Sequence, residues 1–270
     1  MKKTLFALAA VALVFVSCGT KPKQEAPKEV AFEVNGTQFF VGEDGYVTIF
    51  DGTSLDGWRG YGKDHLPSRW GIVDGCLAFK GTGTGEGQTS EGGDIIFDHK
   101  FKNFTLEFEW KVEKGSNSGV FYLAQEVKTP DGNGWEPIYI SAPEYQILDN
   151  ANHPDAQLGQ DGNRQSSSLY DMIPAKPQNS NPFGEWNTGK IMVYKGTVVH
   201  GQNGQNVLEY HLWTPQWTEM LQASKFSEEK WPRAFELLNN CGGDDHEGFI
   251  GFQDHGDNVY FRNIRVKIMD

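Results

Sequence analysis

Apolar and polar residues alternate along much of the chain, most regularly in residues 104–112. Every second residue there is apolar, and Glu107 and Glu109 are among the polar residues between them. Successive side chains of a strand point to opposite faces, so the pattern predicts a strand with one buried face and one solvated face. Similar patterns predict strands at 32–34, 38–41, 46–50, 70–73, 76–79, 120–123, 191–194, 197–200 and 207–210, and a closing pair at 248–253 and 259–266.

The connections between these segments favour tight turns over helices. Asn35-Gly36 and Asp74-Gly75 each separate two predicted strands, which is a strong hairpin signal. Helical character is confined to residues 215–238, where Pro232 interrupts it. The pattern therefore predicts an all-β protein.

One strand carries chemistry on its polar face. In residues 144–148, Tyr145 and Ile147 point one way while Glu144 and Gln146 point the other. The chain then leaves the strand through a polar segment that continues to residue 168. Long polar loops in compact domains are often functional, so we predict a polar, carbohydrate-sized active or binding site here.

Composition supports one β-rich domain and excludes some partners. With 270 residues, 13% of them aromatic, the chain can bury a large core, and its 32 glycines suit many turns. The formal charge of −12 lacks the basic footprint that nucleic acid or an anionic membrane surface would require. Neutral sugars suit this surface, and the oligomeric state is left open.

The first 18 residues resemble a bacterial lipoprotein signal peptide. An apolar run too short for a confident membrane span leads to Val16-Ser17-Cys18. Cys18 is then the lipidated first residue, residues 19–30 form a flexible tether, and 31–270 form the folded domain. This predicts a lipid-anchored protein of the cell envelope, periplasmic or associated with the outer membrane. A plain secretory signal with an incidental Cys18 is the alternative.

Two cysteines remain in the predicted domain, Cys76 and Cys241. They are too few for a disulfide framework, and the sequence leaves open whether they pair. Neither Cys-x-x-Cys nor His-Glu-x-x-His spacing is present, so a preformed zinc site has no sequence support.

An ordered set of motifs resembles the 3-keto-disaccharide hydrolase family. The motifs are Leu-Asp-Gly-Trp at 55–58, Asn-Ser-Gly-Val-Phe at 117–121, Glu-Tyr-Gln-Ile-Leu-Asp at 144–149, Leu-Tyr-Asp at 169–171, Gly-Glu-Trp-Asn at 184–187, and Gln-Asp-His-Gly at 253–256 continuing to Phe-Arg-Asn-Ile at 261–264. The resemblance implies a concanavalin A-like jelly roll of two antiparallel sheets, with carbohydrate chemistry in a concave groove. Residues 213–247 are longer than the family pattern, and Gly189-Lys190 stands where an arginine is usual.

The implied substrate is a 3-keto-glycoside. Its C3 ketone acidifies the C2 proton, so a base can remove that proton while an acid protonates the departing C1 oxygen, and hydration then completes a net hydrolysis. Ordinary hydrolysis by two carboxylates is the alternative route. We predict Glu144 as the base, with a purely structural carboxylate as the alternative.

Three further residues are candidate catalytic groups. His255 can act as an acid or a metal ligand, although Asp-His-Gly-Asp is also an ordinary turn. Asp149 and Asp171 are candidate acid/base groups, but aspartates after strands commonly cap turns. A divalent metal is possible, because carboxylate and amide oxygens recur in the motifs and a Lewis acid would polarise the ketone. No cofactor is demanded.

Amide, aromatic and charged side chains in the motifs are candidate sugar contacts. Amides suit vicinal hydroxyls and aromatic faces suit sugar C–H surfaces, while core packing or turn bonding is the alternative for each. We also expect Arg262 either to bind substrate or to pair with a carboxylate such as Glu144. The substrate-binding candidates are Asn117, Gln146, His153, Tyr170, Glu185, Trp186, Asn187, Gln253 and Arg262.

The leading functional hypothesis is therefore a secreted enzyme that cleaves 3-keto-glycosides. A non-catalytic carbohydrate-binding lipoprotein on the same fold is the rival. Fold alone does not separate the two.

Overall fold

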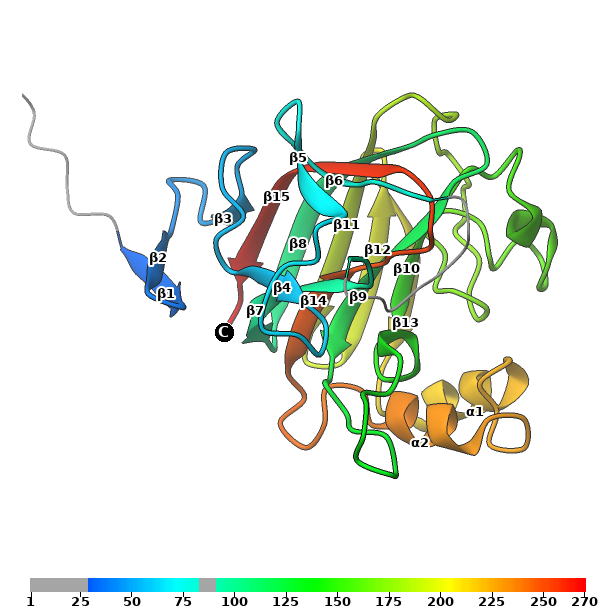
Figure 1. Ribbon diagram of the computed structural model, residues 1–270. Helices are drawn as coiled ribbons and strands as arrows, with labels where there is room; N and C mark the ends of the chain where they lie inside the picture. Colours follow the sequence, from blue (N-terminus) through cyan, green and yellow to red (C-terminus); the bar gives the residue numbers. More distant parts are fainter. Residues whose placement is uncertain (1–28, 83–90) are drawn as a thin grey trace, which may run out of the picture.

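The computed structural model describes residues 29–82 and 91–270 (Figure 1). The predicted signal peptide, Cys18 and most of the tether fall outside the described residues. In the part of the chain that is described, no helix combines the length and apolar character needed to cross a bilayer.

Two antiparallel sheets stack face to face and confirm the predicted β-sandwich (Figure 1). The five-stranded sheet has the order β10 (Glu144–Leu148), β9 (Asn117–Ala124), β14 (Gly248–Phe252), β7 (Ile95–Phe101) and β4 (Trp58–Gly60). The eight-stranded sheet has the order β13 (Gln205–His211), β12 (Thr197–Gln202), β11 (Asn187–Tyr194), β8 (Phe104–Val112), β15 (Val259–Ile268), β6 (Cys76–Phe79) and β5 (Trp70–Val73), with β3 (Val47–Phe50) also paired to β15.

The remaining elements lie around the sandwich. The predicted first hairpin is present as β1 (Val30–Val34) and β2 (Thr37–Phe40), and it lies at one side of the body (Figure 1). Residues 29–82 and 91–270 contain four short helices: η1 (Ile138–Ile140), η2 (Pro154–Gln157), α1 (Pro215–Ala223) and α2 (Pro232–Asn239). Pro232 begins α2 because its missing N–H costs nothing at the first position of a helix.

The alternation seen in the sequence forms the core between the sheets. β8 is buried at every second residue, as predicted. Phe108 of the eight-stranded sheet meets Tyr145 of the five-stranded sheet with ring centroids 5.4 Å apart, and Phe252 meets Phe261 at 4.3 Å. Burying each such side chain contributes about 1.5–3 kcal/mol, so these aromatics hold the two sheets together.

The outer face of the five-stranded sheet is covered at one end. Ile96 and Phe121 form a second apolar cluster with Ile138 of η1, and η1 in turn contacts α2. The other end of this face carries the polar residues of the candidate site.

The two closing strands do not pair with each other, so the predicted closing pair is wrong. β14 lies between β7 and β9, whereas β15 lies in the other sheet. Residues 253–258 cross from one sheet to the other and present polar side chains at the edge of the sandwich. Cys76 and Cys241 are separate buried thiols.

Candidate active site

Four polar side chains are buried on the outer face of the five-stranded sheet. Glu144 and Gln146 lie on β10, Asn117 lies on β9, and Gln253 follows β14, with exposed fractions of 7%, 1%, 3% and 5%. Their neighbours Tyr145 and Ile147 face the core, which confirms the predicted division of the strand. Burying polar groups is costly without partners, so their gathering on one face marks this region as functional.

Glu144 lies across a glycine of the neighbouring strand. A β-carbon at Gly119 would collide with Oε1 of Glu144, and a carboxylate is the nearest group to that position. The strand register places Gly119 opposite Gln146. The absence of a side chain at Gly119 therefore leaves the space in which the Glu144 carboxylate rests.

Tyr170 and Lys225 flank this carboxylate. The Tyr170 backbone N–H donates to the Glu144 carbonyl oxygen at 3.1 Å, and Lys225 Nζ lies 4.3 Å from the centroid of the Tyr170 ring. Burial lowers the pKa of Lys225, against the opposing charges of Glu144 and Asp171. Burial, with the charges of Glu144 and Asp155, raises the pKa of Tyr170. The phenol thus stays protonated, and the amine gives up its proton more readily than an ordinary lysine.

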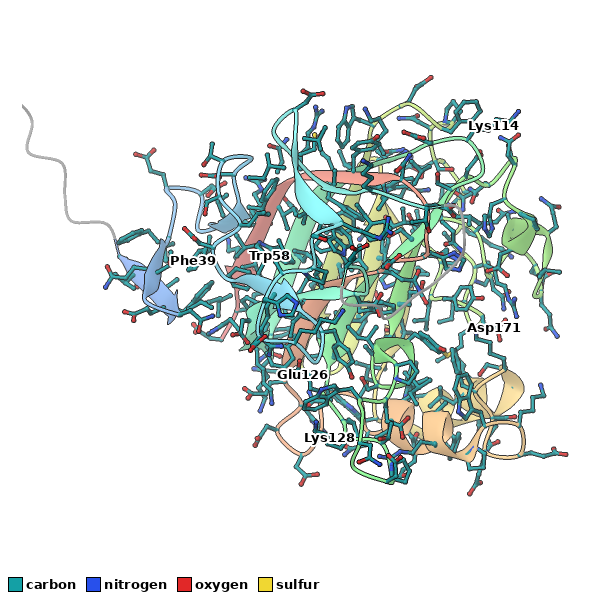
Figure 2. The ribbon with its side chains drawn as sticks, in the orientation of Figure 1. Phe39, Trp58, Lys114, Glu126, Lys128 and Asp171 are labelled. Carbon is teal, nitrogen blue, oxygen red and sulfur yellow. The ribbon has the colours of Figure 1, made fainter. Side chains whose placement is uncertain are left out.

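An arginine fixes the loops that carry these groups. Arg164 Nε donates to Asp171 Oδ1 at 2.7 Å, and its Nη1 donates to Asp155 Oδ1 at 2.8 Å. Asp171 Oδ2 accepts the Lys225 backbone N–H at 2.7 Å, which ties the 150–180 loops to the segment after α1 (Figure 2). With both oxygens bonded, Asp171 holds the backbone of Lys225 in place, and its role as an acid/base group stays a prediction.

Asp149 has a structural role at the end of β10, and its catalytic role stays a prediction. Its Oδ2 accepts the Gly115 N–H at 2.8 Å and its Oδ1 accepts the Ala151 N–H at 3.1 Å. Asp149 therefore caps the turn that ends β10, as short aspartates after strands commonly do.

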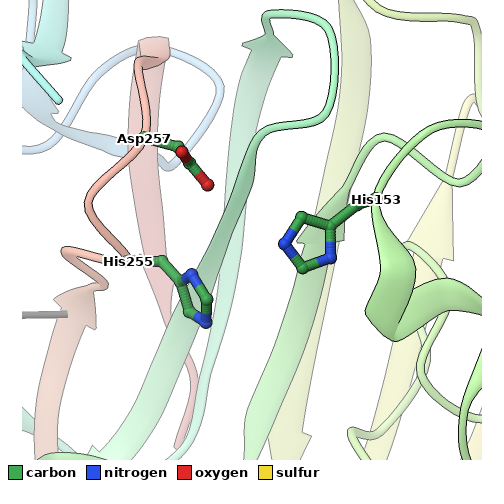
Figure 3. A group of neighbouring side chains, drawn as sticks. All are labelled: His153, His255 and Asp257. Carbon is green, nitrogen blue, oxygen red and sulfur yellow. The ribbon is translucent and has the colours of Figure 1, made fainter. Parts of the chain in front are cut away.

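His153, His255 and Asp257 converge beside Asn117. One ligand atom from each of the three lies within 4.8 Å of the other two, and Figure 3 shows the side chains directed toward a common space. Two imidazoles and a carboxylate suit a divalent transition metal. Burial lowers the pKa of His153, and the charge of His255 lowers it further, so the His153 ring is neutral at pH values where an exposed histidine begins to charge.

Two hydrogen bonds bear on whether a metal fits. Among the described residues, the buried Oδ1 of Asn117 has no hydrogen-bond partner, while the Asn117 N–H donates to Asp257 Oδ2 at 3.1 Å. An unpartnered oxygen beside this cluster suits a cation or a ligand hydroxyl. Nδ1 of His153 accepts the Asp155 N–H at 3.1 Å, which leaves the ring proton on Nε2. A metal bound to Nε2 would shift the ring proton to Nδ1. Nδ1 could then no longer accept the Asp155 N–H, so this hydrogen bond would break.

Four of the predicted substrate contacts, Arg262, Trp186, Glu185 and Asn187, lie away from Glu144. Arg262 is paired with Glu109, not with Glu144, at 2.6 Å on the outer face of the eight-stranded sheet. The Arg262 guanidinium covers the ring of Trp186 at 3.9 Å, and Glu185 is exposed beside it. Asn187 is buried and accepts the Asn181 N–H at 2.7 Å, which is a loop-fixing role.

Sequence reasoning missed Lys225, Arg164 and Asp257. Lys225 lies in residues 213–247, the segment that is longer than the family pattern. That extra length is the only feature of the sequence that points to a role for this residue. Arg164 stands in the long polar loop, and Asp257 closes the Asp-His-Gly-Asp turn. None stands within a periodic pattern that would direct it toward Glu144.

Comparisons with known proteins identify the family and the fold of this chain. The family model for the 3-keto-alpha-glucoside-1,2-lyase-like domain matches residues 45–267. The chain is 64% identical to a 3-keto-disaccharide hydrolase of Bacteroides thetaiotaomicron over the whole of both chains. A solved candidate glycosyl hydrolase from Parabacteroides distasonis is 26% identical, with a TM-score of 0.67 over 84% of this chain and 95% of its own. A second, at 24% identity and a TM-score of 0.53 over 78% of this chain and 99% of its own, shares the fold.

Proposed function

The chain belongs to the family of 3-keto-alpha-glucoside-1,2-lyase-like domains and is an enzyme that acts on glycosides, and we propose that its substrates are 3-keto-glycosides. The observation that carries the proposal is the Glu144 carboxylate, buried over Gly119 with Tyr170 and Lys225 beside it. The name of the Bacteroides thetaiotaomicron relative supports the 3-keto specificity.

Glu144 acts as the base in this proposal. It takes the proton from C2, the electron pair of that bond forms a C1–C2 double bond, and the C1–O bond breaks with its electrons on the glycosidic oxygen. Lys225, whose pKa is lowered by burial, gives that oxygen a proton. Water then adds across the double bond, with its hydroxyl going to C1 and a proton to C2.

His153, His255 and Asp257 would hold a divalent cation in this scheme. When bound, such a cation supplies Lewis-acid polarisation of the C3 ketone. His255 thereby serves as a ligand and not as the acid. Tyr170, Gln146 and Gln253 contribute a phenol and two amides on the same face, and these orient the sugar through its hydroxyls.

The test is turnover of a 3-keto-disaccharide carrying deuterium at C2. Elimination breaks the C2–H bond and predicts a primary isotope effect, whereas two-carboxylate hydrolysis leaves that bond intact. Glu144→Gln should lower kcat by roughly 1,000-fold while substrate binding persists. Turnover of unoxidised disaccharides at the same rate as the 3-keto compound would contradict the proposed specificity.

We also propose that the enzyme is exported and held at the cell envelope through lipidated Cys18. The support is the residue pattern of positions 1–18. Metabolic labelling with a fatty acid should mark the wild-type chain and not Cys18→Ala. An unlabelled, fully secreted wild-type protein would favour the plain secretory signal.

A further inference from the structure

A separate cavity lies on the opposite side of the sandwich from Glu144. It has a volume of about 750 Å3 and hollows the outer face of the eight-stranded sheet. The aromatic core between the two sheets separates it from the candidate active site. The family chemistry described above makes no use of this face.

One continuous row of the sheet forms the floor. Each residue of the row is the register partner of the next, across six strands. The row runs Asn206, Gly201, Lys190, Glu107, Arg265 and Thr48. Five interstrand spacings make it about 24 Å long, which exceeds the width of a single sugar ring.

The polar groups of the row are bonded to one another or to neighbouring residues. Arg265 Nη2 lies 2.6 Å from Glu107 Oε2, and Arg265 Nη1 lies 2.7 Å from Asp44. Lys190 Nζ donates to Asn206 Oδ1 at 2.7 Å, which leaves the two amide hydrogens of Asn206 for another partner. The floor therefore offers many donors and acceptors, and it mixes charges of both signs.

Small residues keep the floor of the trough low. Gly201 has no side chain, and the aliphatic stem of Lys190 lies over it, 3.1 Å from where a β-carbon would stand. Thr188 is an exposed, small lining residue. Phe50 and Phe108 are the aromatic residues of the lining, and only 2% and 1% of their surfaces are exposed, so they offer little apolar contact. A long trough with polar side chains along its floor suits a polyhydroxylated chain better than a peptide, whose binding relies on buried apolar residues.

We propose that this trough, defined by the row from Asn206 to Thr48, is a second carbohydrate-binding site that holds a neutral oligosaccharide of several sugar units. An anionic chain would meet Glu107 and Glu109, and a cationic chain would meet Lys190 and Arg265. Because the trough and Glu144 lie on opposite faces, a glycan in the trough leaves the active site open. The trough keeps the enzyme on a polysaccharide while it turns over small substrates.

Affinity electrophoresis through gels containing soluble β-glucan, starch or mannan tests this proposal. At least one of these should retard the wild-type protein, and Lys190→Met with Asn206→Ala should weaken the apparent affinity at least about tenfold. Thr188→Tyr, a substitution at an exposed position that fills the trough, should do the same without disturbing the core. Lys195→Met removes a surface charge outside the trough and serves as the control.

Turnover separates this proposal from the proposed function. The trough variants should turn over a 3-keto-disaccharide within about twofold of wild type, and Glu144→Gln should lose turnover but keep its retardation. The trough site is overturned if none of the three polysaccharides retards the wild type. It is equally overturned if retardation survives both trough variants, or if Glu144→Gln abolishes it.

Discussion

The Glu144 carboxylate occupies the space that a side chain at Gly119 would need. Gly119 lies on β9 and Glu144 on the neighbouring strand β10. The missing side chain at Gly119 therefore makes room on β9 for the carboxylate from β10. The position of the Glu144 carboxylate therefore depends on a glycine at position 119, and this dependence can be tested without substituting Glu144.

Gly119→Ala should displace Glu144 and lower kcat by roughly 100-fold, because small misplacements of a catalytic group are costly. Overpacking should also reduce the free energy of unfolding by about 1–3 kcal/mol. Gly71→Ala is the matched control, since a β-carbon on that strand meets nothing within 4 Å. Steady-state kinetics and urea unfolding of both variants measure the effect. Unchanged kcat in Gly119→Ala would remove Glu144 from the role of base.

Lys225→Met should lower kcat by roughly 100-fold with little change in KM, because the amine acts on the leaving oxygen. The pKa of Lys225 is lowered from 10.5 by burial, so wild-type activity should fall as the pH rises through this lowered pKa and the ammonium loses its proton. The pH–rate profile of Lys225→Met should lack this alkaline limb. A limb that persists in the variant would assign it to another group.

Co²⁺ titration followed by calorimetry tests the metal cluster. His153→Ala, His255→Ala and Asp257→Asn should each weaken binding at least about tenfold, whereas His211→Ala, at an exposed site outside the cluster, should not. Because the pKa of His153 is lowered, its nitrogen stays available as a ligand below the ordinary histidine pKa of 6.5. Co²⁺ binding that does not change in any of the three variants would exclude the cluster.

His200 should make stability depend on pH. It is fully buried, bonded to the Tyr122 hydroxyl at 2.7 Å and to the Ser167 carbonyl at 2.9 Å, and burial lowers its pKa from 6.5 to about 4. Between these two values the unfolded chain binds a proton that the folded chain does not. The free energy of unfolding therefore falls as the pH is lowered, by about 2 kcal/mol from His200 between pH 7 and pH 5.

Urea unfolding of wild type and His200→Gln at both pH values measures this contribution. The variant is less stable at pH 7 because the buried bonds are altered, but it should lose about 2 kcal/mol less than wild type on acidification. Equal losses in the two proteins would show that His200 does not carry the pH dependence.

Much of the sandwich follows from local pattern. The burial of β8 at alternate residues, the hairpin turn at Asp74-Gly75 and the polar face of β10 all depend on residues adjacent in the chain. The sequence predicts such features because successive side chains of a strand point to opposite faces, so odd and even positions lie on different faces.

The alternation of side chains along a strand does not show which sheet the strand joins, or which residue of the neighbouring strand lies beside each of its residues. The sequence indicates that Arg262 could pair with a carboxylate, but its partner Glu109 is set by the pairing of β15 with β8, about 150 positions apart. For the same reason, the sequence did not show that β14 and β15 belong to different sheets.

The sequence by itself determined the strands, the turns, the family and the carboxylate on β10. Only the tertiary structure decided that Lys225 lies beside Glu144, that His153 meets His255 and Asp257, and that Trp186 and Arg262 lie on the opposite sheet. The physical reason is range: strand periodicity and turn chemistry act between near neighbours, whereas a site is assembled by the packing of segments that no local preference brings together.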